Sequence, residues 1–447
     1  MKCPIPQSCR HARDTILPAA RRNLLAYFLV LLDTTVLTVA LPDLRASLGG
    51  TFADQQWAVN GYTVAFAASL LTGGAVSDRY GAARVFRLGV TGFGVISLMC
   101  ALAPGMGILI ALRALLGLAG ALCLGSSLGL IAQLHTDPAG RARAMGVWAA
   151  LTGTALAAGP LLGGLLVESY GWRAIFLVNP PLAVLSLIAV RGLVSAMGAG
   201  RIDWGVQVVA CAFLGLLAAA ITGFSVPAAS LALVALAVLV WLQRRAPEPV
   251  LPGGSLRASW PGLLTGGVVN FAFSGALFVI TLLLQGERGF TPLEAGLAFL
   301  PLTVPMTFNA LLTGRLVARY GPGPSILASL ALLSAGLTAA PSAIGMIMVG
   351  LGLSCCLPAL VADVVSTAPA GTAGTAGGLL NAVRQVGAVL GVAVMGVVAH
   401  GTADGTSRAL LLAAVLTALT LVVRCGTHWA GRRAAGQDSR VPVRPPM

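Results

Sequence analysis

Two ionisable residues lie within apolar stretches, and together they could bind and release a proton. Asp33 lies in VLLDTTVLTVALP (residues 30–42), and Arg113 lies in a second apolar run, residues 106–134. The proton affinity of a carboxylate depends on its burial and on nearby cations, whereas arginine stays protonated. A change in the separation or hydration of the two groups would therefore switch the proton affinity of Asp33. Proton binding by Asp33, with Arg113 as its partner, is the first chemistry that the sequence suggests.

The composition indicates which kind of element carries these two residues. Of the 447 residues, 57% are hydrophobic and 9% are charged, whereas about 25% of residues are charged in a typical soluble domain. Apolar runs of about 20 residues, long enough to cross a hydrocarbon core about 30 Å thick, recur along the whole chain. The sequence therefore predicts an all-α polytopic membrane protein.

Fourteen transmembrane helices are expected, with twelve or thirteen as alternatives because several apolar blocks nearly touch. Of the 28 basic residues, four lie in expected outer loops, Arg113 and Arg384 lie within helices, and the remaining 22 lie in inner loops and tails. This asymmetry follows the positive-inside rule and predicts that both termini are cytoplasmic. It also accounts for the net charge of +14 without a nucleic-acid partner. The expected helices are 23–42, 55–76, 84–103, 106–134, 143–166, 175–195, 204–223, 226–243, 262–285, 293–317, 324–339, 341–365, 374–399 and 406–424.

Asp33 and Arg113 are expected at similar depths in the membrane. Asp33 lies about ten residues into the first helix, which is roughly 15 Å at 1.5 Å per residue and near the midplane. Arg113 lies roughly 10 Å below the outer boundary by the same rise. A charge at the bilayer centre costs at least ~2.5 kcal/mol, so intramembrane ionisable residues are candidates for function. The alternative for both residues is a structural role, as an ion pair or a polar contact between helices.

An internal repeat divides the chain. GAVSDRYGAAR (residues 74–84) recurs as GRLVARYGPGP (residues 314–324), which keeps Arg-Tyr-Gly but has Ala318 in place of Asp78. Each copy lies at the expected cytoplasmic turn of a helix pair, and the copies are eight helices apart rather than six. Two six-helix bundles separated by an inserted pair of helices account for this offset. The expected domains are an N-terminal bundle with its cytoplasmic tail (1–200), the inserted pair (201–245), a C-terminal bundle (246–425) and a cytoplasmic tail (426–447).

The sequence contains no catalytic motif in a supporting context. A P-loop requires Gly-Lys-Ser/Thr, and because the only lysine is Lys2, an ion gradient or a partner must drive any uphill transport. GSSLG (residues 125–129) has the spacing of a hydrolase elbow but lies inside an expected helix. There is no HExxH or CxxC pattern, and the eight cysteines mostly fall in apolar runs. We therefore expect no enzyme activity, no metal and no cofactor, with a proton gradient as the energy source.

Over nearly its whole length, the sequence resembles the fourteen-helix drug:proton antiporter family of the major facilitator superfamily, in which parallel six-helix repeats are typical. Within that family it most resembles actinomycete antibiotic-resistance exporters of the methylenomycin type. It departs from the family patterns at Thr38, Leu116, Ala82 and Ala83, where Asn, Gln and basic residues are common. The motifs that carry the resemblance are LDTTVLTVALP (32–42), GAVSDRYGAAR (74–84), RALLGLAGA (113–121), GTALAAGPLLGG (153–164), WRAIFLVNPP (172–181) and GLLNAVRQVGAVLG (378–391).

The resemblance implies roles for three groups of residues. It gives Arg113 a part in proton coupling. It makes Asp78, Arg79 and Gly81 a gate between the two halves, with Asp78 near the N-terminus of the helix that starts at residues 372–375. The alternative for this loop is an ordinary turn with topological charge. The fifth helix would bend at its antiporter motif, or its small residues would simply pack closely. Its motif residues are Gly153, Gly159, Pro160, Gly163 and Gly164.

Polar residues in the second half are candidates for a substrate cavity. Three of them share one helix face by their spacing and are the strongest candidates. Apart from Asp33, no acidic residue lies deep in an expected helix, which argues against a divalent organic cation as substrate. The candidates are Asn270, Asn309, Asn381, Arg384 and Gln385, of which the last three share a face.

These observations and the resemblance together predict a proton-coupled efflux transporter that exports a small hydrophobic drug or antibiotic by alternating access and confers resistance. It is expected as a monomer in the bacterial cytoplasmic (inner) membrane, with protons, the substrate and the lipid bilayer as partners. One alternative is a major-facilitator transporter of an endogenous metabolite or siderophore. A second is a non-transporting membrane sensor or enzyme.

Overall fold

The computed structural model describes residues 7–134, 138–192, 204–223, 225–245, 253–367, 373–400 and 404–438, and helices make up nearly all of them. The predicted fold class, an all-α polytopic membrane protein, is confirmed. Helices suit a bilayer because each satisfies its own backbone hydrogen bonds. The elements are α1 (Gln7–Leu48), α2 (Phe52–Tyr80), α3 (Ala82–Ala101), α4 (Met106–Leu134), α5 (Pro138–Tyr170), α6 (Ala174–Leu177), α7 (Asn179–Ala189), α8 (Trp204–Thr222), α9 (Val226–Arg245), α10 (Gly253–Leu282), the π-helical η1 (Leu283–Glu287), α11 (Pro292–Ala298), α12 (Leu300–Tyr320), α13 (Pro322–Ala339), α14 (Ala343–Thr367), α15 (Ala373–Ala399) and α16 (Gly405–Asp438).

Each of the fourteen predicted helices corresponds to helical structure. Three of them are divided: residues 175–195 contain α6 and α7, residues 262–285 run from α10 into η1, and residues 293–317 contain α11 and α12. Within the described residues, nine helices are long and apolar enough to cross a membrane. The helices on either side of the 114° bend at residues 171–173 would together add a tenth. The structure is consistent with fourteen spans, and that number stays a prediction.

The repeated Arg-Tyr-Gly sequence ends two helices in the same way. α2 ends at Gly81 (φ 90°) and α12 ends at Gly321 (φ 77°), and each glycine N–H donates to a carbonyl of the preceding turn. Glycine adopts positive φ without the steric cost that other residues incur. The arginine of each copy lies over its neighbouring tyrosine ring, at 5.6 Å in the first copy and 5.3 Å in the second. The internal repeat is therefore a repeat of local structure.

The N-terminal ends of α2 and of the α11–α12 unit also match. Thr51 caps α2 in a capping box with Asp54, and Thr291 caps α11 in a capping box with Glu294. In both boxes, the threonine hydroxyl accepts from the acidic residue's N–H, and the carboxylate accepts from the threonine N–H. These reciprocal bonds satisfy N–H groups that the first helical turn cannot satisfy internally. The repeat thus extends over the whole of α2 and of α11–α12.

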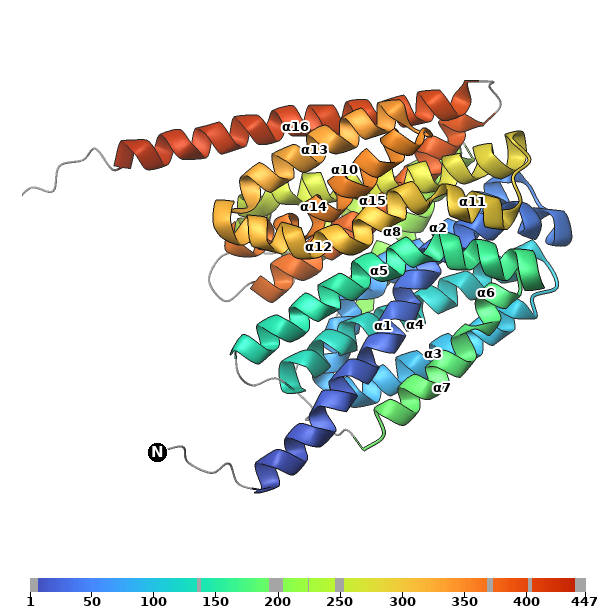
Figure 1. Cartoon of the computed structure of the whole chain (residues 1–447). Coiled ribbons are helices and arrows are strands. Elements are labelled where there is room, and N and C mark those ends of the chain that lie inside the picture. Colours follow the sequence, from blue (N-terminus) through green and yellow to red (C-terminus); the bar gives the residue numbers. More distant parts are fainter. Residues whose placement is uncertain are drawn as a thin grey trace, which may run out of the picture.

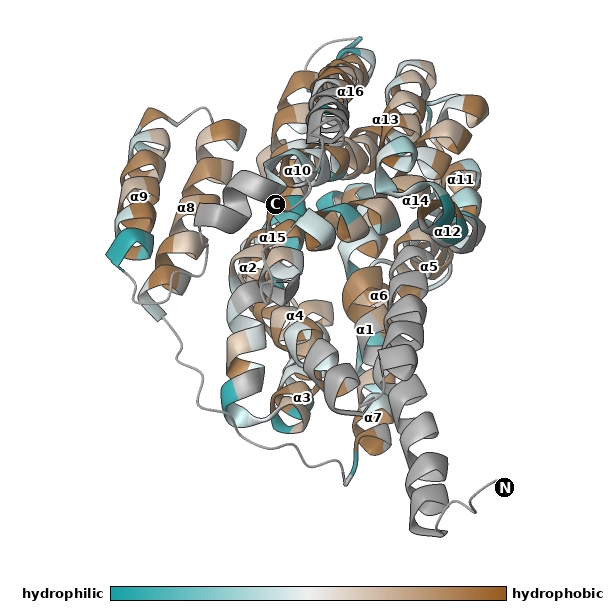
Figure 2. Ribbon diagram, turned by 90° about the vertical axis from the view of Figure 1, so that its left-hand side faces the viewer, coloured by the Kyte–Doolittle hydropathy of each residue, from teal (hydrophilic) through white to brown (hydrophobic). Residues whose placement is uncertain are grey.

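The helices form two groups that pack against each other (Figure 1). The first group is α1 to α7 and the second is α10 to α16, with α2 packed on α15 and α5 packed on α11 and α12. α8 and α9 lie together at one side (Figure 2), where Leu214 and Ala218 of α8 pack against α2 and α15. Both helices are apolar and little covered by protein, as lipid-facing helices would be. The domain boundaries given above are untested and stay predictions.

Candidate functional site

Candidate functional residues lie on two faces of helix α1. Leu31, Thr34, Thr35 and Thr38 line a cavity between the two helix groups. Their spacing is that of one face of a helix. Asp33 is not among the lining residues and is only 2% exposed. The carboxylate and the cavity are therefore on different sides of the same helix.

Asp33 forms a buried ion pair with Arg113. Its Oδ2 accepts a hydrogen bond from a terminal nitrogen of Arg113, and each side chain is 1% exposed. The Arg113 Nε donates to the Ala58 carbonyl oxygen over 3.0 Å, and the guanidinium lies 4.5 Å from the centre of the Tyr62 ring. Tyr62 in turn donates its hydroxyl hydrogen to the Val30 carbonyl over 2.9 Å. The pair is thus enclosed by residues of α1, α2 and α4. The contact between Asp33 and Arg113, which their similar expected depths in the membrane suggested, is present.

The second carboxylate oxygen of Asp33, Oδ1, makes no hydrogen bond of good geometry in the described part of the chain, although the Asn179 side chain lies near enough to interact with the carboxylate. A buried oxygen without a partner is costly, and such groups concentrate at functional sites. A proton on this oxygen would neutralise the carboxylate while Oδ2 still faces Arg113. The geometry is suitable for reversible protonation, and the coupling role of Asp33 and Arg113 stays a prediction.

A polar network, which sequence reasoning missed, borders the Asp33–Arg113 pair. Asn179, at the start of α7, is 2% exposed and donates to the Ser97 hydroxyl over 2.9 Å. Ser97 donates to the Phe176 carbonyl oxygen, also over 2.9 Å. The normal helical donor to that carbonyl would be residue 180, which is a proline and has no N–H. The sequence signal for this network was the pair Asn179–Pro180 within WRAIFLVNPP.

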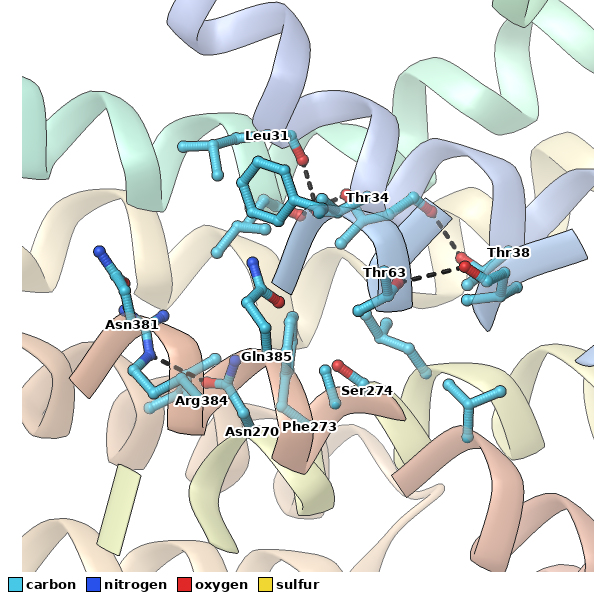
Figure 3. Close-up of a pocket in the computed structure, with 18 of the residues that line it drawn as sticks. Leu31, Thr34, Thr38, Thr63, Asn270, Phe273, Ser274, Asn381, Arg384 and Gln385 are labelled. Carbon is cyan, nitrogen blue, oxygen red and sulfur yellow. Dashed lines mark hydrogen bonds between the residues drawn. The ribbon is translucent and has the colours of Figure 1, made fainter. Parts of the chain in front are cut away.

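The cavity lies between the two helix groups, and residues of α1, α2, α4, α5, α10, α14 and α15 line it. Figure 3 shows threonines of the first group on one side of the cavity and amide-bearing residues of the second group on the other. The remainder of the wall is largely apolar. The lining residues are Leu31, Thr34, Thr35, Thr38, Val59, Thr63, Phe66, Leu124, Leu156, Asn270, Phe273, Ser274, Leu277, Leu353, Leu357, Asn381, Arg384, Gln385, Ala388 and Val392.

Four of the five predicted cavity residues line this space. The Nε of Arg384 donates to the Asn270 side-chain oxygen over 3.2 Å, and a terminal nitrogen donates to the Asn381 side-chain oxygen over 3.1 Å. Gln385 lies beside them on α15 (Figure 3). Asn309 does not line the cavity, because its amide donates to Ser354 and Cys355 between α12 and α14. The lining of this cavity does not support a substrate contact by Asn309, and that role stays a prediction.

The small residues of α5 allow close contact with α1. A β-carbon at Gly159 would lie 1.9 Å from the Thr35 hydroxyl oxygen, and one at Gly163 would lie 2.7 Å from the Val36 carbonyl oxygen. Pro160 leaves the Leu156 carbonyl without its helical donor, and the Thr35 hydroxyl lies 3.3 Å from that oxygen in donor geometry. α5 therefore holds α1 at positions next to Asp33.

The same segment of α5 contacts the second helix group. A β-carbon at Gly164 would lie 2.4 Å from the Pro292 carbonyl oxygen, and one at Gly296 of α11 would lie 2.7 Å from the Pro160 carbonyl oxygen. The antiporter-motif residues therefore form a contact between the two groups, whereas the predicted bend itself stays a prediction. The surroundings of Gly153 lie outside the described side chains.

Further contacts join the two groups at the end of the bundle predicted to face outward. The Gln56 amide donates to the carbonyls of Val392 and Ala393 over 3.0 and 3.1 Å, and the Gln285 amide donates to the Val39 carbonyl over 2.8 Å. The rings of Phe52 and His400 stack at 4.1 Å. These residues lie near the start of α2 and the ends of α1 and α15, so the groups are closely joined at this end.

The predicted gating loop is only partly described. Arg79 is exposed and lies over Tyr80, and Gly81 makes the turn into α3. The side chain of Asp78 lies outside the described side chains. The gating role of Asp78, Arg79 and Gly81 stays a prediction.

A second ion pair was not expected from the sequence. Arg424 of α16 donates to Asp363 of α14 over 2.8 Å, and the two side chains are 10% and 19% exposed. Asp363 and Arg424 lie close to the ends of the expected helices 341–365 and 406–424, so counting residues along these helices does not mark them as buried charges.

Two packed groups of apolar helices, with a part-polar cavity between them and a buried ion pair beside it, define a membrane transporter. The chain belongs to the Major Facilitator Superfamily, whose family model matches residues 24–201 and 190–392.

Relatives with assigned names support this placement. The chain is 36% identical to the "Tetracenomycin C resistance and export protein" of Streptomyces glaucescens, over 83% of this chain and 73% of that one. It is 33% identical to the "Methylenomycin A resistance protein" of Streptomyces coelicolor, over 85% and 84% of the two chains. Among solved structures, the peptide transporter POT in complex with sulfate has a TM-score of 0.69 at 14% identity, over 92% of this chain and 94% of that one. The last likeness concerns the fold alone.

Proposed function

We propose that this chain is a proton-coupled antiporter that exports a small hydrophobic drug or antibiotic from a bacterial cell and thereby confers resistance. The observation that carries the proposal is the arrangement of α1, which has the sealed Asp33–Arg113 pair on one side and the cavity on another. The names of the relatives, which are resistance and export proteins, support the direction and the kind of substrate. The proposed location is the cytoplasmic membrane, with both termini in the cytoplasm.

Coupling in this proposal passes through α1. Protonation of Asp33 removes the negative charge that Arg113 contacts, so the ion pair and the packing of α1 depend on the bound proton. Thr35, two residues further along, contacts both α5 and the cavity. A shift of α1 therefore changes the cavity wall and the proton site together. A single element that both ligands bias is the physical requirement for coupled transport.

The contacts between the two helix groups support a state that is closed toward the outside in the proposed orientation. Gln56, Gln285 and the residues around Gly164 join the groups at that end. In such a state a substrate would enter the cavity from the cytoplasm. Proton entry from outside would require these contacts to open, as alternating access demands.

One proton per substrate provides sufficient driving energy for resistance. Moving one charge across the membrane contributes about 2.3 kcal/mol per 100 mV, and one pH unit contributes about 1.4 kcal/mol. Because every 1.4 kcal/mol is a tenfold ratio, the two together support a gradient of a neutral solute of more than about a hundredfold.

Everted membrane vesicles test the proposal. With an acidic lumen, the wild-type chain should accumulate members of a panel of fluorescent hydrophobic compounds, and a protonophore should abolish the accumulation. Asp33→Asn should lose accumulation yet retain counterflow, which is exchange of labelled for unlabelled compound without a proton gradient. Asp33→Glu, which keeps the carboxylate, should retain part of the accumulation. Full accumulation by Asp33→Asn would contradict proton coupling through Asp33, and gradient-driven efflux from the lumen would favour an importer.

A further inference from the structure

The side-chain amide of Asn179 is held in one orientation by hydrogen bonds that begin at a proline. Pro180 has no N–H, so the Phe176 carbonyl lacks its helical donor, and it accepts from the Ser97 hydroxyl over 2.9 Å instead. A hydroxyl has one hydrogen, and this bond uses it. Toward Asn179, which lies 2.9 Å away, Ser97 can therefore only accept. The amide must present its NH₂ group, and not its oxygen, to Ser97.

The NH₂ group of Asn179 has a second hydrogen, and the Asp33 carboxylate lies within its reach. α7 packs on both α1 and α3 (Figure 1), and the Asn179 side chain lies near enough to interact with the carboxylate. Oδ2 of Asp33 faces Arg113, so Oδ1 is the oxygen left for this hydrogen. Asp33 and Asn179 are each 2% exposed, so water has little access to either side chain.

Protonation reverses what Oδ1 of Asp33 can do. A charged carboxylate only accepts hydrogen bonds, and a donor directed at it favours the charged form. A proton on Oδ1 adds an O–H donor that opposes the N–H of Asn179. The amide must then rotate, which breaks its bond to Ser97, or α1 and α7 must move apart. The orientation that Ser97 imposes on the amide therefore favours the charged state of Asp33.

We propose that Asn179 is a positioning residue of the proton site, whose amide, oriented by Ser97, donates to the charged carboxylate of Asp33 and so sets the pH at which α1 takes up and releases its proton. This inference rests on the proposed function and adds a residue and a helix to its coupling site. The proton acts on α7 through Asn179 as well as on α4 through Arg113, so one protonation event changes the contacts of α1 with two neighbouring helices.

Other titratable groups face Asp33, and the test must hold their charges constant. Among the described residues they are Arg113 of α4, Tyr62 of α2 and Cys100 of α3, and all three are buried. Asn179 carries no charge in either state. Its replacement therefore changes the hydrogen bonding of Asp33 and leaves the net charge of the site as it is, so a shift in the titration of Asp33 reports on the amide.

Infrared titration of the purified full chain in detergent tests the inference. The band of the protonated carboxyl group is assigned to Asp33 by its loss in Asp33→Asn, and its midpoint pH is measured in each variant. Asn179→Leu keeps the approximate size of the side chain and removes the amide. Because the charged carboxylate loses a donor, the midpoint should rise by about one pH unit, which is about tenfold in proton affinity.

Variants of Ser97 test whether the orientation of the amide matters. Ser97→Ala leaves Asn179 in place but removes the group that orients it, and the midpoint should rise by less than in Asn179→Leu. Ser97→Thr keeps the hydroxyl and should titrate as the wild type does. A merely structural role of the network would change stability in these variants without moving the midpoint.

Asn309 provides a matched control in the second helix group. Its amide also donates to a serine hydroxyl over 2.9 Å, that of Ser354, between α12 and α14. Asn309→Leu removes the same kind of hydrogen bond away from Asp33 and should leave the midpoint unchanged. A midpoint in Asn179→Leu equal to that of the wild type overturns the inference, and so does an equal shift in Asn309→Leu.

A spectrum of the wild-type chain tests the inference even if Asn179→Leu does not fold. Proton uptake by Asp33 should disturb the amide of Asn179. The difference spectrum between acidic and alkaline samples should therefore contain a side-chain amide band that shifts when the asparagine side chains carry a heavy nitrogen isotope. The absence of such a band overturns the inference, as does the absence at every pH of a carboxyl band that Asp33→Asn removes.

Accumulation in everted vesicles separates this inference from the proposed function, because the infrared titration requires no transport. If wild-type vesicles show protonophore-sensitive accumulation and Asn179→Leu leaves the midpoint in place, the inference fails and the proposed function stands. If Asn179→Leu moves the midpoint but wild-type vesicles show no gradient-driven accumulation, the proposed function fails and the action of Asn179 on Asp33 stands.

Discussion

The described part of the molecule contains two aspartate–arginine pairs that differ in how deeply they are buried. Asp33–Arg113 joins α1 to α4 in the middle of the first helix group, and both side chains are 1% exposed. Asp363–Arg424 joins α14 to α16 near the end of the apolar part of α16, and the side chains of Asp363 and Arg424 are 19% and 10% exposed, respectively. Both pairs join two helices of one group, so their connectivity is alike and their surroundings differ.

This difference in burial determines at which pair the binding of a proton depends on a change of conformation. Asp363 and Arg424 are partly exposed near the end of the apolar part of α16, so a change at one of them need not leave the other sealed inside the protein. Asp33 is enclosed by α1, α2 and α4 with Asn179 of α7 nearby, and its Oδ1 makes no hydrogen bond of good geometry among the described residues. A proton can reach it only if the helices move, which is the behaviour that coupled transport requires. Four predictions test this contrast, in order of decreasing effect.

Replacing the arginine of each pair should reveal the largest difference between the pairs, and that difference should appear in the free energy of unfolding. Arg113→Gln leaves Asp33 buried beside no cation and should lower the free energy of unfolding by about 3–5 kcal/mol. Arg424→Gln should cost about 1–2 kcal/mol, between the values for exposed and fully buried pairs. Unfolding of the reconstituted protein in denaturing detergent measures both. The double variant Asp33→Asn/Arg113→Gln removes the uncompensated charge and should recover much of the loss. Equal costs for the two single arginine variants would contradict the contrast.

Neutralising one aspartate should distinguish the pairs through transport. Asp33→Asn should lower gradient-driven accumulation by about a hundredfold or more, equivalent to about 2.7 kcal/mol. Asp363→Asn should change accumulation by less than about threefold, because the pair is partly exposed and Arg424 is not left sealed inside the protein. Accumulation is normalised to the amount of folded protein in each vesicle preparation. A comparable loss in Asp363→Asn would assign coupling to both pairs.

Much of the site could be predicted from the sequence because two simple measures apply to it. Counting residues from the start of an apolar run gives depth, and depth placed Asp33 near Arg113. The 3.6-residue helical period gives faces, and it placed Asn381, Arg384 and Gln385 together on α15. The repeated Arg-Tyr-Gly sequence identified the C-terminal ends of the equivalent helices α2 and α12. It did not indicate the capping boxes at the N-terminal ends of α2 and α11.

The remaining features depend on helix rotation, which sequence spacing does not give. Asn309 has the same residue type as Asn270, yet the orientation of α12 directs its amide to α14. Asp363 pairs with Arg424 because α14 and α16 both pack on α10, although these residues are 61 positions apart. Asn179 contributes to a network only because α3 presents Ser97 to the proline break between α6 and α7.

Glycine substitutions beside each pair test whether helix packing, rather than charge, distinguishes them. A β-carbon at Gly159 would meet the side-chain root and the neighbouring backbone of α1, at 2.8 Å from the Thr35 Cβ and 3.1 Å from the Val36 nitrogen. At Gly262, the nearest atom would be a methyl group of Val364 at 2.5 Å, and the three nearest atoms all belong to side chains rather than to backbone. Gly159→Ala should therefore cost about 1–3 kcal/mol, and Gly262→Ala less.

The control for this comparison is Gly74→Ala in α2, where a β-carbon would have no neighbour within 4 Å. It should be neutral or stabilising by up to about 1 kcal/mol, because alanine favours helix. Detergent unfolding measures stability, and accumulation in vesicles reports on coupling. Gly159→Ala should reduce accumulation although every charge remains. An unaffected Gly159→Ala would show that α1 is not held by α5.

The smallest effect is expected at Tyr62, whose ring covers one side of the Arg113 guanidinium at 4.5 Å. Tyr62→Phe removes only the hydroxyl that donates to Val30, and should cost about 1 kcal/mol. Tyr62→Leu also removes the cation–π contact, which is worth about 2 kcal/mol when desolvated, and should cost correspondingly more. Among the described ring contacts, Arg424 has no aromatic neighbour, so the ring belongs to the sealed pair alone. The difference in unfolding free energy between the two Tyr62 variants measures what the ring contributes. Equal stabilities would mean that burial by α1, α2 and α4 holds Arg113 without help from the aromatic ring.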